Sequence, residues 1–221
     1  MQVQLSFFST LVVLLSAQLI VALPARASPC LLGQVDRPET PNLAPVAFSA
    51  QIRQENGGDV APDLRGEYFE ASFEVKTHDI NAKPILGPKE YPYMYDVVEV
   101  FISSSAKGYP YFEIELSPFD QTFEVKIVDP HHPFIKNYHL EISTLVTPRA
   151  NGWRGDIRVP LKSIGWDGQP ESLIGNAYSV LGRKGHRHYW SAFPLPQTKR
   201  PNFHQPQSFL NLLTCSPGEP K

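Results

Sequence analysis

Proline is the residue that most constrains how this chain can fold. The 221 residues include 22 prolines, about one in ten, and they occur along the whole length of the chain. Because proline lacks a backbone N–H and clashes inside helices and central strands, it interrupts long elements. No window of the sequence shows a long, regular helical period. The chain is therefore predicted to form many short strands joined by rigid connections.

Alternating apolar and polar residues predict where those strands lie, because successive side chains of a strand point to opposite faces. The two-residue period occurs at 45–54, 66–80, 91–101, 109–117, 122–129, 152–165 and 176–194. Single helical turns are expected at 161–166 and 207–213. This spacing is typical of an all-β fold, a single-domain antiparallel β-sandwich of the immunoglobulin- or jelly-roll-like kind with short helical turns.

The N-terminal segment has the features of a secretory signal. Residues 5–23 are mostly apolar and are followed by "PARAS", in which Ala25 and Ala27 fit the small-residue rule for cleavage after Ala27. No Lys or Arg precedes the apolar run, so a retained membrane anchor is the alternative. We expect a signal peptide at 1–27, an extended lead-in at 28–45, the sandwich at 46–215 and a C-terminal tail at 216–221. The protein would then be secreted or periplasmic, with no membrane span after removal of the signal.

The chain contains two cysteines, Cys30 and Cys215, one near each end of the expected mature protein. Exported proteins meet oxidising conditions and chain ends often lie close together, so a disulfide between them is predicted. Two unpaired thiols are the alternative. The formal net charge is only −2 and no basic stripe occurs, so nucleic acid is not an expected partner.

The stretch "YPYMYDVVEVF", residues 91–101, combines a strand pattern with acids and a row of tyrosines. Val98, Val100 and Ile102 share one face, which is wholly apolar beyond Asp96 and is expected to face the core. The other face holds Glu99 among aromatic rings. This mixture is typical of a surface that binds a flat, polar ligand.

The same residue types recur on the neighbouring segments. Sugar rings have apolar CH faces and a rim of hydroxyls, so a site for them needs flat aromatic surfaces and a few hydrogen-bonding groups. A simpler interpretation is that the tyrosines lie at a rim and the glutamates on a solvated strand face. The candidate set with this composition is Tyr93, Tyr95, Tyr111, Glu99, Glu113 and Arg183.

Four blocks in order resemble carbohydrate-binding module family 9 and its wider DOMON-like relatives. The first is "YMYDVVEVFI" followed by "YPYFEIELSP", and the second is "WRGDIRVPLKSIG". The last two are "NAYSVLGRKGHRHYWSAFP" and "NFHQPQSFLNL". The resemblance covers roughly residues 45–213.

The resemblance implies a β-sandwich that binds sugars, often chain ends, between aromatic side chains. By position, Tyr93 stands where family members place a stacking Trp, and Glu99 stands where they place a carboxylate that bonds sugar hydroxyls. The second aromatic wall would be Trp190 or Phe203. It further implies a non-catalytic role in carbohydrate catabolism, beside partner glycan-degrading enzymes.

Two other functions are compatible with parts of the sequence. Glu113 and Glu115 form a pair of carboxylates, which would suit a glycoside hydrolase acting on O-glycosyl bonds, but neighbours on one strand face point the same way and cannot flank a bond. Some DOMON-like relatives are cytochromes that bind haem b for electron transfer through a Met ligand, which would be Met94 here. No C-x-x-C-H motif for covalent haem attachment occurs.

Two pairs of histidines are candidate metal ligands. The pairs His131 with His132 and His186 with His188 have suitable ligands, but Arg183, Lys184 and Arg187 surround the second pair with positive charge. We therefore expect no metal among the site residues. The resemblance allows a structural calcium, for which Asp36, Glu39 and Asp79 would supply oxygen ligands.

Overall fold

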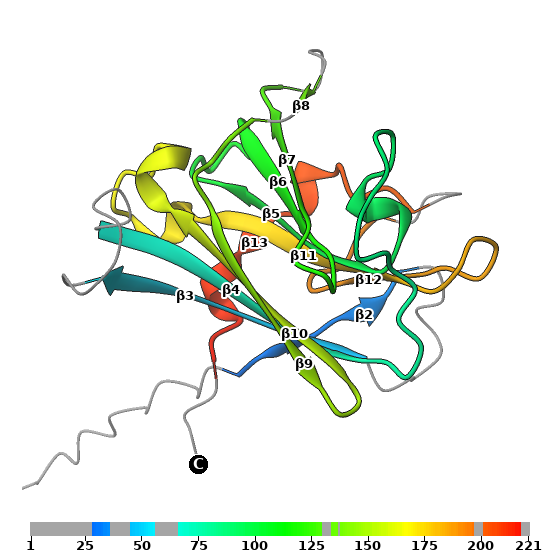
Figure 1. Cartoon of the computed structure of the whole chain (residues 1–221). Coiled ribbons are helices and arrows are strands. Elements are labelled where there is room, and N and C mark those ends of the chain that lie inside the picture. Colours follow the sequence, from blue (N-terminus) through cyan, green and yellow to red (C-terminus); the bar gives the residue numbers. More distant parts are fainter. Residues whose placement is uncertain are drawn as a thin grey trace, which may run out of the picture.

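The fold is a sandwich of two antiparallel β-sheets, as predicted (Figure 1). The computed structural model describes residues 28–35, 45–55, 66–129, 134–136, 138–196 and 201–217. The expected signal peptide lies outside the described residues. The same is true of four candidate metal ligands, Asp36, Glu39, His131 and His132. Within the described part of the chain, no helix has both the length and the apolar character needed to cross a membrane.

The first sheet has five strands in the order β1-β3-β4-β10-β9. Its long strands alternate as the sequence predicted, so Trp153, Ile157 and Val159 point inward from β10 and are buried. Gly155 lies between the first two, where a Cβ would come within 2.8 Å of the Trp153 ring. The strands are β1 (Cys30–Leu31), β3 (Val46–Glu55), β4 (Gly66–Lys76), β10 (Gly152–Pro160) and β9 (Ser143–Arg149).

The second sheet has eight strands in the order β2-β12-β11-β5-β6-β7-β8, with β13 pairing β11 beside this path. Its centre is an antiparallel meander of β5, β6 and β7. The strands are β2 (Gly33–Gln34), β12 (His188–Ser191), β11 (Ile174–Leu181), β5 (Val97–Ser103), β6 (Tyr111–Leu116), β7 (Thr122–Ile127), β8 (Ile135–Lys136) and β13 (Leu210–Asn211). Short 3₁₀ helices are η2 (Pro92–Met94), η3 (Leu161–Ile164), η4 (Pro170–Ser172), η5 (Pro206–Ser208) and η6 (Leu212–Thr214).

The eight-stranded sheet is buried on both faces. All seven residues of β5 are buried, although only one of its faces meets the other sheet. Val98, Val100 and Ile102 belong to the core between the sheets, which confirms the predicted core face. The outer face carries a second apolar cluster, built from Phe101, Tyr111, Phe123, Val125, Ile127, Tyr178 and Phe209.

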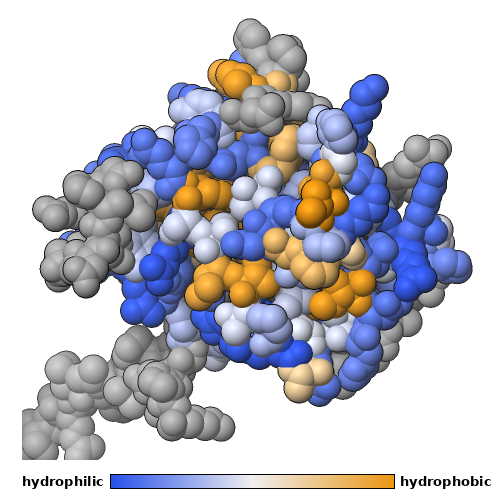
Figure 2. All heavy atoms as spheres, viewed as in Figure 1, coloured by the Kyte–Doolittle hydropathy of each residue, from blue (hydrophilic) through white to orange (hydrophobic). Residues whose placement is uncertain are grey.

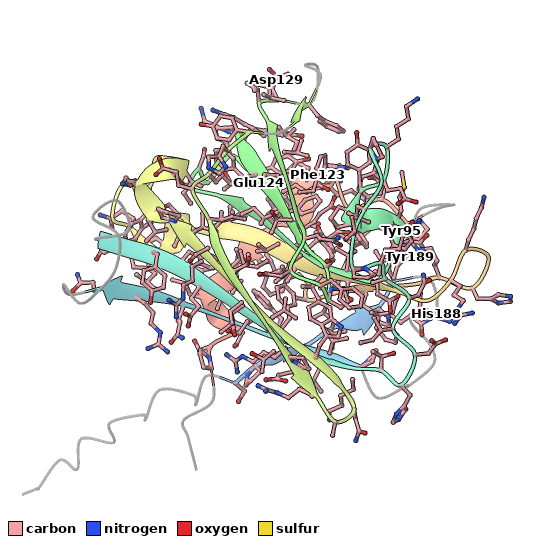
Figure 3. All side chains as sticks on the ribbon, in the orientation of Figure 1. Tyr95, Phe123, Glu124, Asp129, His188 and Tyr189 are labelled. Carbon is pink, nitrogen blue, oxygen red and sulfur yellow. A yellow bond between two sulfur atoms is a disulfide. The ribbon has the colours of Figure 1, made fainter. Side chains whose placement is uncertain are left out.

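Strand β7 shows how this second cluster arises. Phe123 and Glu124 lie on different sides of the strand (Figure 3), and it is the apolar residue that faces outward. Glu124 points toward the inter-sheet side at the end of the sandwich, where it accepts a hydrogen bond from Leu140 N at 2.7 Å. Loops must therefore cover the outer face, because a bare apolar sheet face would be exposed to water.

A buried carboxylate ties two of those loops together. Asp96 accepts hydrogen bonds from Asn81 N at 2.9 Å and from Gly182 N at 2.7 Å. Asn81 Nδ2 in turn donates to Gly182 O at 3.0 Å. Burial raises the pKa of Asp96, and the two backbone donors oppose that rise. The acid therefore joins the loop before β5 to the turn between β11 and β12.

The chain ends are linked by the predicted disulfide. Cys30 on β1 and Cys215 after η6 are bonded, with their Cα atoms 5.1 Å apart and 185 residues between them in sequence. Residues 30–34, within the segment expected to lead into the sandwich, form β1 and β2, which pair with β3 and β12. The N-terminal segment therefore contributes a short strand to each sheet.

Removing the disulfide should lower the free energy of unfolding substantially. Cross-linking so long a loop contributes up to about 5 kcal/mol in the chain-entropy model. The variant Cys30→Ala/Cys215→Ala should therefore unfold at a clearly lower urea concentration than the parent. An unchanged midpoint, or two alkylatable thiols in protein exported under oxidising conditions, would contradict this.

Asp96→Asn should destabilise the fold by about 1–3 kcal/mol, because an amide NH₂ would meet a backbone N–H that needs an acceptor. Urea denaturation measures the change. The control is Asp79→Asn, which removes an exposed ion pair with Arg183 and should cost under about 0.5 kcal/mol. Equal effects of the two changes would show that Asp96 does not secure the loops.

Candidate functional site

A cavity of about 350 Å³ lies on the outer face of the eight-stranded sheet. Strands β5, β6 and β7 form its floor, and η2, the β11–β12 hairpin and residues 201–204 form its walls. Its size falls in the range of small-molecule sites. The lining residues are Tyr93, Glu99, Phe101, Glu113, Phe123, Val125, Phe134, Val180, Arg187, Tyr189, Pro201, Asn202, Phe203 and His204.

The aromatic walls are held in place by other rings. Tyr93 stacks on Tyr91 with ring centroids 5.3 Å apart, and its ring meets the edge of Phe123 at 6.0 Å. Phe203 stacks on Tyr178 at 4.1 Å with an interplanar angle of 9°. Tyr189, which is labelled in Figure 3, lies edge-on to Phe203. These rings are therefore positioned before any ligand binds.

Three carboxyl groups lie together at the floor. Glu99 and Glu113 line the cavity although their residues are only 3% and 8% exposed. Glu115 is fully buried and pairs with Glu99 across β5 and β6. Its Oε2 accepts a hydrogen bond from Tyr93 N at 2.9 Å, so Glu115 positions the wall rather than facing a ligand.

Burial and mutual repulsion keep these acids partly protonated. Burial raises the pKa of Glu99 well above its ordinary value, Glu113 raises it further, and Arg187 opposes the rise. Burial likewise raises the pKa of Glu115, and Glu99 and Glu113 add to it. Glu115 Oε1 is buried and has no hydrogen-bond partner among the described residues. The group therefore carries fewer than three negative charges near neutral pH.

Two basic side chains complete the site. Arg187 Nη2 donates to the backbone carbonyls of Tyr93 at 2.5 Å and Tyr95 at 3.0 Å. His204 bonds Tyr111 Oη through Nδ1 at 3.0 Å, and its Nε2 lies 3.7 Å from Glu113 Oε2. Because burial lowers the pKa of His204 to about 4, the imidazole is neutral near pH 7. The contact with Glu113 is then not an ion pair.

The structure brings four of the predicted site residues together. Tyr93, Glu99, Glu113 and Phe203 all line the cavity. Tyr111 lies directly beneath it, buried in the second apolar cluster and bonded to His204.

Three predicted residues lie elsewhere. Tyr95 does not line the cavity and donates to Glu90 at 2.7 Å. Arg183 is exposed in the β11–β12 turn and pairs with Asp79 at 3.1 Å. Trp190 is buried in the core between the sheets, because it pairs with Ser179, one residue out of phase with the outward-facing Tyr178. Of the two candidates for the second aromatic wall, the cavity contains Phe203.

Sequence reasoning missed several lining residues, among them Phe101, Phe123, Arg187, Asn202 and His204. Phe101 could have been included, because it shares the parity of Glu99 on β5. The contribution of 201–204 depends on how the segment folds back over the sheet, for which the sequence holds no local signal.

The described candidate ligands for haem and metal lie outside the cavity. Met94 is 41% exposed in η2 and does not line the cavity. His186 is exposed, and His188 Nδ1 lies 3.3 Å from Gln34 Nε2. Among the described residues, no group of three or more His, Cys, Asp or Glu side chains is arranged to hold a metal ion. Asp79, the one candidate calcium ligand of the three that lies within the described residues, forms an ion pair with Arg183.

Comparison with protein families gives no matching family model, and no curated protein matches the sequence. A solved structure from Bacteroides uniformis ATCC 8492, named a "putative carbohydrate-binding protein", is similar in fold. The TM-score is 0.54 at 15% sequence identity, over 82% of this chain and 83% of that one. At this identity the likeness shows a shared sandwich architecture.

The buried acids predict an unusual dependence of stability on pH. The folded pKa of Glu99 is raised, so above about pH 4.5 the folded state holds more protons than the unfolded state and stability falls as pH rises. Glu99→Gln removes this loss. The free energy of unfolding of Glu99→Gln minus that of the parent should therefore increase between pH 5 and 8, by at most about 1.4 kcal/mol per pH unit.

Urea denaturation at several pH values measures this difference. Glu171→Gln is the matched control, because Glu171 is exposed in η4 and does not line the cavity. Its difference from the parent should stay constant with pH. A constant difference for Glu99→Gln as well would mean that Glu99 titrates normally in the folded protein.

Proposed function

We propose that this protein is a non-catalytic carbohydrate-binding protein of the family 9-like, DOMON-like type. The observation that carries the proposal is the cavity itself, where positioned aromatic rings and the carboxyls of Glu99 and Glu113 meet in one hollow. Tyr93 and Glu99, the two residues selected by the family resemblance, both line it. The distant structural neighbour from Bacteroides uniformis, named for carbohydrate binding, is consistent with the proposal.

The chemistry of the cavity suits a sugar ring. Tyr93, Phe123 and Phe203 supply flat apolar surface for the CH faces of a pyranose. Glu99, Glu113 and Arg187 supply acceptors and donors for the hydroxyl rim, and bonds to charged groups are stronger than neutral ones. Nearby apolar surface excludes water and strengthens those bonds.

Binding without cleavage is the better-supported role. Glycosidic hydrolysis needs two carboxyls that flank the bond. Glu113 and Glu115 leave the same face of β6, and Glu115 is fully buried and bonded to the backbone of Tyr93. Glu99 rises from the adjacent strand of the same floor, so all three acids approach a ligand from one side.

The proposed setting is secreted or periplasmic. The disulfide between Cys30 and Cys215 suits an oxidising compartment, as does the signal-like segment that precedes it. In such a setting the protein would bind sugars for carbohydrate catabolism, with cleavage carried out by partner glycan-degrading enzymes.

A glycan array, followed by calorimetry on the saccharides that bind, tests this function. Tyr93→Ala and Phe203→Ala should each weaken binding at least tenfold, about 1.4 kcal/mol, because each removes a wall of the cavity. The matched control is Phe119→Ala. Phe119 is 45% exposed in the β6–β7 turn and outside the cavity, so its loss should leave affinity unchanged.

Denaturation curves should accompany these titrations, so that loss of the fold is not mistaken for loss of the site. If folded Tyr93→Ala and Phe203→Ala bind saccharide as tightly as the parent, the cavity is not the binding site. If no saccharide on the array binds the parent, the proposed function is wrong.

A further inference from the structure

We propose that the cavity is built for an acidic sugar, a uronic acid whose carboxylate binds to Arg187, an inference that rests on the proposed carbohydrate-binding function. The ligand chemistry is a planar anion attached to a ring with an apolar face. Arg187 lines the cavity beside the aromatic walls. Its hydrogen bonds, its charge and the protonation of the acids around it all favour a ligand that brings a negative charge.

Arg187 brings to the cavity wall a hydrogen-bond donor that no acceptor in the described part of the chain uses. Its Nη2 donates to the backbone carbonyls of Tyr93 and Tyr95, which holds the guanidinium in place. Its Nε–H is buried and has no partner among the described residues. A buried donor without an acceptor is costly, and most such groups in proteins are satisfied. An acceptor on a ligand in the cavity would satisfy this one.

Arg187 also differs from the other arginines of the described ranges in its partners. Its hydrogen bonds go to uncharged carbonyl groups, and its Cζ lies 5.9 Å from the ring centroid of Tyr189. Each of the others forms an ion pair with a carboxylate within the fold, namely Arg53, Arg149, Arg154, Arg158 and Arg183. A carboxylate on the ligand would give Arg187 the same kind of partner, through charge-assisted hydrogen bonds.

The acids near Arg187 do not take this role, because burial keeps two of them largely protonated. Burial raises the pKa of Glu99 well above its ordinary value, and the opposing effect of Arg187 is smaller. Burial raises the pKa of Glu115 in the same way. Glu113 already interacts with other groups of the protein, including Glu115. Since a protonated carboxyl has an O–H to donate, Glu99 can act as a second donor toward an anion.

The donors and rings of the cavity together suit a uronic acid. Arg187 Nε–H and a protonated Glu99 are two donors that lie close enough to interact, which matches the two oxygens of a planar carboxylate. Both residues line the same hollow as Tyr93 and Phe203, whose rings offer apolar surface to the face of a pyranose. Asn202 at the wall adds a side-chain amide for the ring hydroxyls. A carboxylate without a sugar ring would use only part of this lining.

Glu99 couples the binding of such an anion to pH. Loss of its proton would place a second negative charge beside the ligand carboxylate, so the bound state holds this proton more tightly than the free state. Affinity for the acid should therefore fall as pH rises through the raised pKa of Glu99. Ligand carboxylic acids titrate at about pH 3–4, below that range. The charged and titratable groups around Glu99 are Glu113 and Glu115 on β6, Tyr178 on β11, Arg187 and Tyr189 from the β11–β12 hairpin, Tyr93 on η2 and His204.

Three glycosides that differ only at carbon 6 test the proposal. They are methyl β-D-glucuronide, its uncharged amide and methyl β-D-glucoside, together with their galacto counterparts, titrated into the purified protein by calorimetry. At about pH 5.5 the acid of at least one series should bind at least tenfold tighter than its amide and its neutral sugar. The affinity for the acid should fall between about pH 5.5 and 8.5, whereas the affinity for the amide should not.

Variants assign the effect to Arg187 and Glu99. Arg187→Gln should abolish the preference for the acid, because it removes the charge and the Nε–H donor, and the matched control Arg183→Gln should retain it. Arg183 lies in the same hairpin turn but is exposed, pairs with Asp79 and does not line the cavity. Glu99→Gln should keep the preference and lose its dependence on pH. Denaturation curves check that each variant is folded, and if Arg187→Gln is not, the comparison of acid and amide on the parent decides.

An amide or neutral sugar that binds as tightly as the acid, or a folded Arg187→Gln that keeps the preference, would overturn the uronic-acid inference and leave the proposed function intact. Cyclohexanecarboxylate, a ring carboxylate without hydroxyls, should bind more weakly than the sugar acid. If it binds as tightly as the acid and no neutral sugar binds, both proposals are overturned. No binding by any of these ligands would overturn the inference, and the glycan array would then decide the function.

Discussion

Burial of β5 on both faces is the constraint on which the rest of this structure depends. One face supplies Val98, Val100 and Ile102 to the core between the sheets, and the other carries Glu99 and Phe101 under a cover of loops. Those loops stay in place because Asp96 binds two of them and Glu115 binds the backbone of Tyr93. Since the cover is incomplete, a cavity with an aromatic and acidic lining remains. The surface of the molecule otherwise shows separate apolar patches among hydrophilic residues, as expected of a protein whose apolar residues are mainly inside (Figure 2).

The acids at the cavity floor do not strengthen the fold. Burying three neighbouring carboxyls costs free energy, which is reflected in the raised pKa values of Glu99 and Glu115. On the outer face of the first sheet, Glu70 pairs with Arg53 and Arg158, and Asp156 pairs with Arg154. A cluster of acids that lowers stability and faces a hollow is typical of a binding site.

Much of the fold could be predicted from the period-two pattern, and less of the site. Alternation identified the strands and placed Glu99 opposite the core face, and export chemistry identified the disulfide. Residues 91–95 were expected to extend the strand, but Pro92 begins a 3₁₀ helix there and β5 starts at Val97. The alternation of side chains between two faces does not continue through a turn. Arg183 and Arg187 lie on either side of Gly185, whose φ is 91°, so the alternation could not predict that Arg187 and not Arg183 lines the cavity. The position of Trp190 in the core depends on the register of β11 against β12, which no local sequence feature predicts.

We propose that sugar binds to the outer face of the eight-stranded sheet and not to the charged groove of the first sheet. A crystal structure of the protein grown with the tightest-binding saccharide from a glycan array tests it most directly. We expect a sugar ring in the cavity, against Tyr93 and Phe203, with a polar group of the sugar within hydrogen-bonding distance of Glu99. A sugar bound instead between Arg53 and Arg158 on the first sheet, or one that contacts neither Glu99 nor Glu113, would contradict it.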